Sequence, residues 1–140
     1  MATPTNLPAS AVSGTVLTAA YLNDLRGAFR ILQVVSTNKT DTFSMSSTTF
    51  ADVTGLSVTI TPQSTSSKIF VMASVSGTGT TAATNFFGRL LRNSTPINVG
   101  DAAGSRVQAT IVSRDQESQS TMPIMFLDSP ATTSATTYKI

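Results

Sequence analysis

The chain of 140 residues contains neither cysteine nor histidine. The absence of cysteine excludes disulfides, thiolate nucleophiles and sites that depend on cysteine ligands, such as iron–sulfur clusters. The absence of histidine removes the commonest general base and metal ligand, together with every Ser-His-Asp arrangement. Tryptophan is also missing and only two tyrosines are present, so flat stacking surfaces for sugars are scarce. We therefore expect no enzyme, no catalytic residue and no cofactor.

Carboxylates are the remaining candidates for chemistry, because paired acids can hydrolyse glycosides and oxygen ligands can bind calcium or magnesium. The one close pair, Asp115 and Glu117 in "RDQESQS", lacks the dense Asp/Asn/Gly spacing of a calcium loop and is typical of a solvated turn. The glycine-bearing stretches "SGTGTTAAT" and "GDAAGS" match neither a phosphate loop nor a dinucleotide fingerprint. We expect no metal site.

Charge is scarce as well. Only 11% of the residues are charged, and the net charge is +2. The basic residues occur singly along the chain, so no cluster could neutralise a phosphate backbone, and nucleic-acid binding is not expected. The first residues lack a basic start and a continuous apolar core, and no apolar run approaches about 20 residues. We expect synthesis in the cytoplasm and no insertion into a membrane.

Serine and threonine are abundant, at about three residues in ten, and hydrophobic residues make up 40% of the chain. Thr and Val suit pleated, half-buried surfaces, and the length allows one domain with a core. The composition predicts an all-β domain.

The N-terminal part differs from the rest. Residues 1–16 contain Pro4, Pro8 and Gly14 without a helical or strand period, which predicts an extended arm that docks on another surface. The residues expected to dock it are Leu7, Pro8, Val12, Val16 and Leu17.

A short amphipathic helix is predicted over residues 17–30, with Thr18 as a fair N-cap. An apolar stripe follows helical spacing and also matches positions a and d of a heptad; it consists of Leu22, Leu25, Phe29 and Leu32. A helix of this length is only marginally stable by itself in water. The stripe is therefore expected to pack either on its own domain or on copies of itself.

From Ile31 onward the apolar period changes to two, and residues 31–140 are predicted to form an antiparallel β-sandwich, jelly roll or barrel. Gly55 is expected to adopt a positive φ, and Pro62 and the Asp128-Ser129-Pro130 stretch to end strands. Alternate Arg89 and Arg92 are expected to be exposed on one strand, which ends in an Asn93–Pro96 turn. Strands are predicted at about 30–37, 41–46, 56–61, 67–76, 85–92, 107–114, 121–128 and 136–140.

Two of these strands, "KIFVMASV" and "TMPIMFL", carry apolar residues at consecutive positions, which predicts burial of both faces. Either a loop or the N-terminal arm covers the outer face, or another subunit does.

Two stretches carry a family resemblance. The phrase "GTVLTAAYLN" resembles a segment that introduces a short helix in bacteriophage fibre and appendage proteins. The stretch "TDTFSMSSTTFADVTGLSVTITPQSTSSKIFV", with the later "RLLRNSTPINVGDAAGSR" and "LDSPATTSATTYKI", resembles β-sandwich modules of phage virions, including phages of marine and aquatic bacteria. Such modules usually continue beyond "TYKI", so the resemblance implies a truncated product or the start of a longer protein.

The resemblance implies a jelly-roll-like β-sandwich that assembles as a homotrimer, with the helical stripe at the three-fold seam. It further implies a virion structural protein, in a tail fibre or fibre-anchoring module, which binds other virion proteins through its arm and supports attachment to the host. The alternatives are a head decoration or head-fibre protein on the capsid and a stand-alone module that binds a host receptor or carbohydrate.

Overall fold

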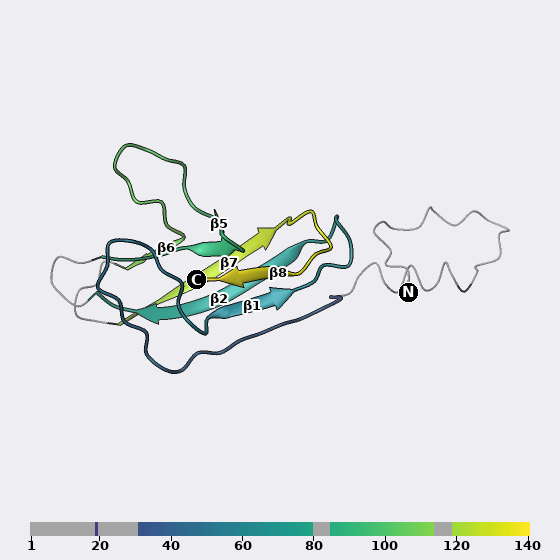
Figure 1. Ribbon diagram of the computed structural model, residues 1–140, viewed down its shortest axis with the longest axis horizontal. Helices are drawn as coiled ribbons and strands as arrows, with labels where there is room; N and C mark the ends of the chain where they lie inside the picture. The colour runs from purple at the N-terminus through teal and green to yellow at the C-terminus, as the bar shows by residue number, and fades with distance from the viewer. Residues whose placement is uncertain (1–18, 20–30, 80–84, 114–118) are drawn as a thin grey trace.

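The computed structural model describes residues 19, 31–79, 85–113 and 119–140, and its regular structure is β throughout, apart from the single helical residue Ala19 (Figure 1). The arm predicted over 1–16 lies outside the described residues, as does the helix predicted over 17–30 apart from Ala19. The strands in chain order are β1 (Ser57–Ile60), β2 (Ile69–Gly77), β3 (Phe86–Gly88), β4 (Leu90–Arg92), β5 (Thr95–Ile97), β6 (Ile111–Ser113), β7 (Ser120–Asp128) and β8 (Thr136–Lys139).

The described strands form three antiparallel sheets. One sheet has four strands in the order β1-β8-β4-β5, and the pairs β2-β7 and β3-β6 form the other two. Strand β6 also lies against β7, which brings the two small sheets next to each other. The all-β, antiparallel class predicted from the sequence is therefore confirmed.

The longest pairing joins β2 and β7 over nine residues each. Its register runs from Ile69 opposite Asp128 to Gly77 opposite Ser120. Because successive side chains of a strand point to opposite faces, each strand divides into an inward and an outward set. The inward set is apolar and buried or half-buried, and it contains Val71, Ala73, Val75, Met122, Ile124 and Phe126.

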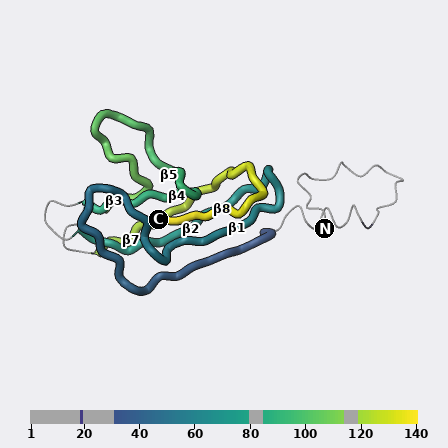
Figure 2. The backbone as a smooth tube through the Cα atoms, viewed as in Figure 1, coloured from purple at the N-terminus to yellow at the C-terminus, as the bar shows by residue number. Residues whose placement is uncertain are grey.

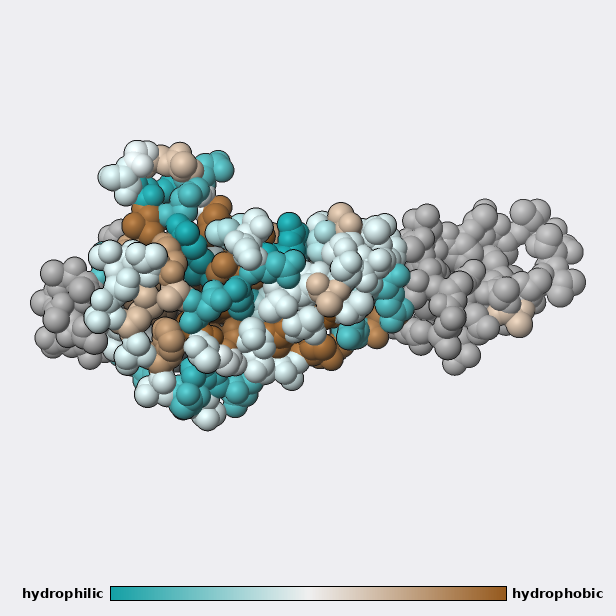
Figure 3. Space-filling model, viewed as in Figure 1, coloured by the Kyte–Doolittle hydropathy of each residue, from teal (hydrophilic) through white to brown (hydrophobic). Residues whose placement is uncertain are grey.

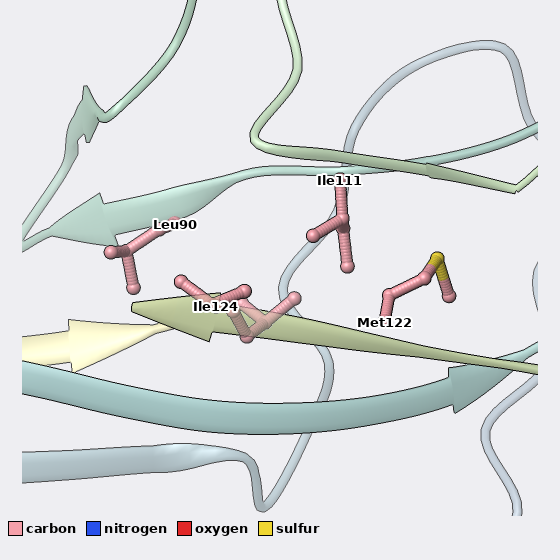
Figure 4. Close-up of a cluster of buried hydrophobic side chains, with 5 residues drawn as sticks. Leu90, Ile111, Met122 and Ile124 are labelled. Atoms are coloured by element: carbon pink, nitrogen blue, oxygen red, sulfur yellow. The ribbon is translucent and has the colours of Figure 1, made fainter. Parts of the chain in front are cut away.

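The core lies between this ribbon and the remaining strands. Leu90 and Ile124 are each 2% exposed at its centre. Figure 4 shows Ile111 pointing from β6 toward Met122 and Ile124 on β7. Ile140 completes the buried cluster from the end of β8. Strands separated by up to about 50 residues in sequence are thus held together by side-chain burial, which is worth about 1.5–3 kcal/mol for a large apolar residue.

Turn chemistry follows the predictions in three places and departs from them in one. Gly55 has a φ of 86°, β1 ends two residues before Pro62, and β7 ends at Asp128. The predicted Asn93–Pro96 turn is instead a tight turn followed by strand β5, and Asn93 there has a φ of 54°. Pro96 is tolerated because β5 is an edge strand, where a missing N–H costs no ladder bond.

The predicted strands at 30–37 and 41–46 are wrong for the described residues, because residues 31–50 form no strand. This stretch is the dark blue tube along the outer side of the sheets in Figure 2. A strand needs a partner for its backbone groups as well as a β-rich sequence, and no described strand pairs with this stretch. Two further boundaries differ: the strand predicted over 85–92 is interrupted at Arg89, and that over 107–114 is limited to Ile111–Ser113.

Gly88 is a position where the packing admits no side chain. A Cβ there would lie 2.7 Å from Cγ1 and 2.8 Å from Cδ1 of Ile111, which is itself buried. We expect Gly88→Ala to lower the free energy of unfolding by about 1–3 kcal/mol through overpacking. The midpoint of urea unfolding measures this. Gly77→Ala is the matched control, since its Cβ would meet its nearest neighbours at 3.6 Å or more, and an equal loss in both variants would contradict the prediction.

Candidate assembly surface

The outward face of the β2–β7 ribbon carries large apolar side chains that nothing in the described structure covers. Phe70 is 59% exposed, Met72 69%, Met125 67% and Leu127 58%. The register places Phe70 opposite Leu127 and Met72 opposite Met125, so the four side chains form a two-by-two array across the strands. We call these four residues the apolar ribbon face.

Uncharged residues continue this surface toward the other end of the ribbon. Ser74 lies opposite Pro123, and both are exposed. Beyond them the hydroxyls of Ser76 and Thr121 form a hydrogen bond of 3.0 Å across the strands. None of the outward residues of either strand is charged, and the surface therefore changes from apolar to hydroxyl-bearing along the ribbon.

The apolar ribbon face is large for a small domain. Its four side chains expose on the order of 500 Å², in the upper part of the range for the largest apolar patch on a monomer. Figure 3 shows one side of the molecule, where pale residues of near-neutral hydropathy and teal hydrophilic residues surround brown apolar residues. A surface rich in Ser and Thr with an apolar patch is typical of a protein that meets a partner there.

A buried polar cluster lies where β4, β7 and β8 converge. Arg92 Nη1 donates hydrogen bonds to Oδ1 and Oδ2 of Asp128 at 2.9 and 3.1 Å, and Tyr138 Oη donates to Oδ2 at 2.6 Å. Asp128 is 5% exposed and Tyr138 3% exposed. Burial, followed by the neighbouring Asp128 carboxylate, raises the pKa of Tyr138 well above its usual value. Since each group has its partner, the cluster holds three strands together and offers no free reactive group.

This cluster corrects the prediction that Arg89 and Arg92 are exposed, because both are half-buried. Arg89 stacks on the Phe50 ring at 3.8 Å from its centroid and donates from Nε to the carbonyl of Gln108 at 2.6 Å. Sequence reasoning missed the Arg92–Asp128 pair because 36 residues separate the partners. The position of Asp128 at the end of an apolar strand was the only local feature that could have indicated this pair.

The predicted site residues lie almost entirely outside the described structure. Leu32 is the one member of the helical stripe that is described, and it is 41% exposed. The other members, Leu22, Leu25 and Phe29, and all the docking-arm residues lie outside the described ranges. The trimer seam and the docking arm therefore remain predictions.

Comparison with models of known protein families, with curated protein sequences and with solved structures yields no match. Among the described residues, no group of three or more acidic side chains is placed to hold a metal ion. The same residues include no helix with the length and apolarity needed to cross a membrane.

The Tyr138 hydroxyl should affect stability in a pH-dependent way. Its pKa is raised on folding, so the stabilisation is fully present below about pH 10, the unfolded value, and is lost as the pH rises further. We expect Tyr138→Phe to cost about 1–3 kcal/mol at pH 8, because the bond to Asp128 is lost. The difference in unfolding free energy between the natural chain and the variant, measured by urea unfolding, should become smaller between pH 10 and 11, because the natural chain loses stability there. A cost that stays constant across this range would contradict the assignment.

Proposed function

We propose that the protein is a structural component of a bacteriophage virion: a trimeric tail-fibre or fibre-anchoring module that attaches to the tail and supports host recognition. The observation that carries the proposal is the apolar ribbon face, which no described residue covers. The resemblance of residues 14–23 and of the β region to phage appendage modules supports the same interpretation.

Burial between identical copies accounts for this face better than a ligand does. Small-molecule sites are concave and combine apolar walls with a few polar groups that fix orientation. The apolar ribbon face lies on the outside of a two-stranded sheet and carries no charged group among its outward residues. Soluble homo-oligomers close by symmetry, so a trimer would bury every copy of the face at once.

The dimensions of the face suit the centre of such an interface. A standard interface buries about 800 Å² per partner, with an apolar centre and a polar rim. The apolar ribbon face would supply roughly 500 Å² of centre. The adjoining Ser74, Ser76 and Thr121 would supply the rim, where hydroxyls can bond to a neighbour or to water.

In this proposal the three described sheets are parts of one jelly-roll-like sandwich. The proximity of β6 to β7 supports this, since it would align β2-β7 and β3-β6 as one layer. The four-stranded sheet would form the second layer, with Leu90, Ile124 and Ile140 between the layers.

Charged residues placed in the apolar ribbon face should prevent assembly without disturbing the fold. We expect the double variant Met72→Lys, Met125→Lys to be monomeric, while the natural chain is a trimer by native mass spectrometry and light scattering. Both positions are exposed in the single chain, so the circular dichroism spectrum should be unchanged. The control Ala102→Lys, Ser105→Lys adds the same charge to an exposed loop and should remain trimeric. A trimeric Met72/Met125 variant would contradict the role of this face.

The virion assignment needs a separate observation. Gold-labelled antibodies against the protein, applied to intact particles of the phage that encodes it, should mark the tail. Labelling of the capsid would replace the tail-fibre function with head decoration. Particles that carry no label, when antibody binding to the free protein is verified, would overturn the virion function.

A further inference from the structure

Residues 31–37, which we call the leading segment, have the composition of a strand but no strand partner. Their sequence, ILQVVST, contains no charge, proline or glycine. Within the described part of the chain, none of their backbone groups forms a hydrogen bond. Ile31 is 81% exposed and Val34 79%, while Leu32 and Val35 are partly covered. Ordered β-rich backbone left unpaired is rare in a finished assembly, because each unpaired group must otherwise be satisfied by water.

The end of the leading segment is fixed to its own domain. Thr37 Oγ1 donates to the carbonyl of Gly55 at 3.5 Å, at the turn that precedes β1. Lys39 lies over the same turn and pairs with Asp41 at 2.6 Å, which neutralises the only two charges of residues 31–51. Phe50, stacked on Arg89, fixes the stretch a second time. Thr37 is therefore held near the turn before β1, while residues 31–36 form no ladder with any described strand.

The same chain offers an edge that could accept such a segment. Strand β2 pairs with β7 on one side, and no other described strand pairs with its second side. This free edge is nine residues long, and its sequence, IFVMASVSG, contains no charge and no proline. Proteins normally protect long edges of this kind with charges, prolines, bulges or a covering segment, because unpaired edges recruit further strands.

We propose that the leading segment of one copy pairs, as an added strand, with the free edge of β2 in a neighbouring copy. Seven residues of strand span about 23 Å and nine span about 30 Å, so the segment fits on the edge. The added strand would place Ile31 and Val35 on one face and Leu32 and Val34 on the other, so that one of these apolar pairs extends the apolar ribbon face. The inference rests on the proposed function, since it specifies how the copies of the assembly are joined.

The neighbour, rather than the segment's own β2, is the partner for a geometric reason. Thr37 and Lys39 tie the segment to the turn before β1, which belongs to the four-stranded sheet. Strand β2 belongs to a different sheet, and the segment does not pair with it within the chain. Donor and acceptor are thus both present in one molecule, and within its described part they are not paired with each other, as exchange between copies requires.

Cross-linking between distinguishable copies tests the pairing, and the cysteine-free chain makes it specific. One chain carries Val34→Cys and a co-expressed chain of different mass carries Met72→Cys, Ser74→Cys or Ser76→Cys, all at exposed positions. With a short bis-maleimide we expect a link between the two chains at one or more of the β2 positions. The control partner Ala102→Cys, on the exposed loop, should give none.

Each other outcome overturns the inference in a recognisable way. When both cysteines are placed in one chain, a link within that chain alone would show that the segment pairs with its own β2. A trimer without any link to β2 would refute strand exchange and leave the proposed function intact. A monomeric natural chain would refute both.

Proline substitution separates backbone pairing from side-chain burial. Successive N–H groups of a strand point to opposite sides, so Val34→Pro, Val35→Pro must remove at least one ladder bond. We expect this variant to lose the trimer, whereas Val34→Thr, Val35→Thr retains every N–H group and should keep it. Because no described residue pairs with the segment in the single chain, neither variant should alter the unfolding of the monomer. Equal retention of the trimer would contradict the inference.

Discussion

The pairing of β2 with β7 is the constraint on which the rest of the structure depends. Both strands are apolar at consecutive positions, and the nine-residue register fixes which side chains face inward. The inward set is covered by Leu90, Ile111 and Ile140 and forms the core. The outward set has no cover among the described residues. The core and the proposed assembly surface are therefore two faces of one ribbon.

Hydrogen bonds between hydroxyl groups link neighbouring strands at the surface, where many small domains have ion pairs. Thr59 and Thr137 bond across β1 and β8 at 2.8 Å, much as Ser76 and Thr121 bond across the ribbon. Asp128 is the buried charge among the described residues, and Arg92 and Tyr138 satisfy it. Exposed ion pairs contribute at most about 1 kcal/mol, so a hydroxyl surface forfeits little stability.

The leading segment and the apolar ribbon face both have groups that lack partners among the described residues. Within the described part of the chain, the backbone of the leading segment has no hydrogen-bond partners, and the side chains of the apolar ribbon face have no apolar partners on their outer side. Strand exchange with a neighbour would supply the first, and packing between copies the second. A single chain with both deficits is well suited to a structural assembly, where stability comes with association.

The sequence by itself determined the all-β class, the positions of β1, β2, β7 and β8 and the positive φ of Gly55, because period-two patterns and turn residues are local properties. It also indicated the apolar ribbon face, through consecutive apolar residues in two strands. Only the tertiary structure decided that 31–37 forms no ladder, that Pro96 lies on an edge strand and that Arg92 meets Asp128. These three outcomes depend on which segments lie next to each other, and a local pattern does not contain that information.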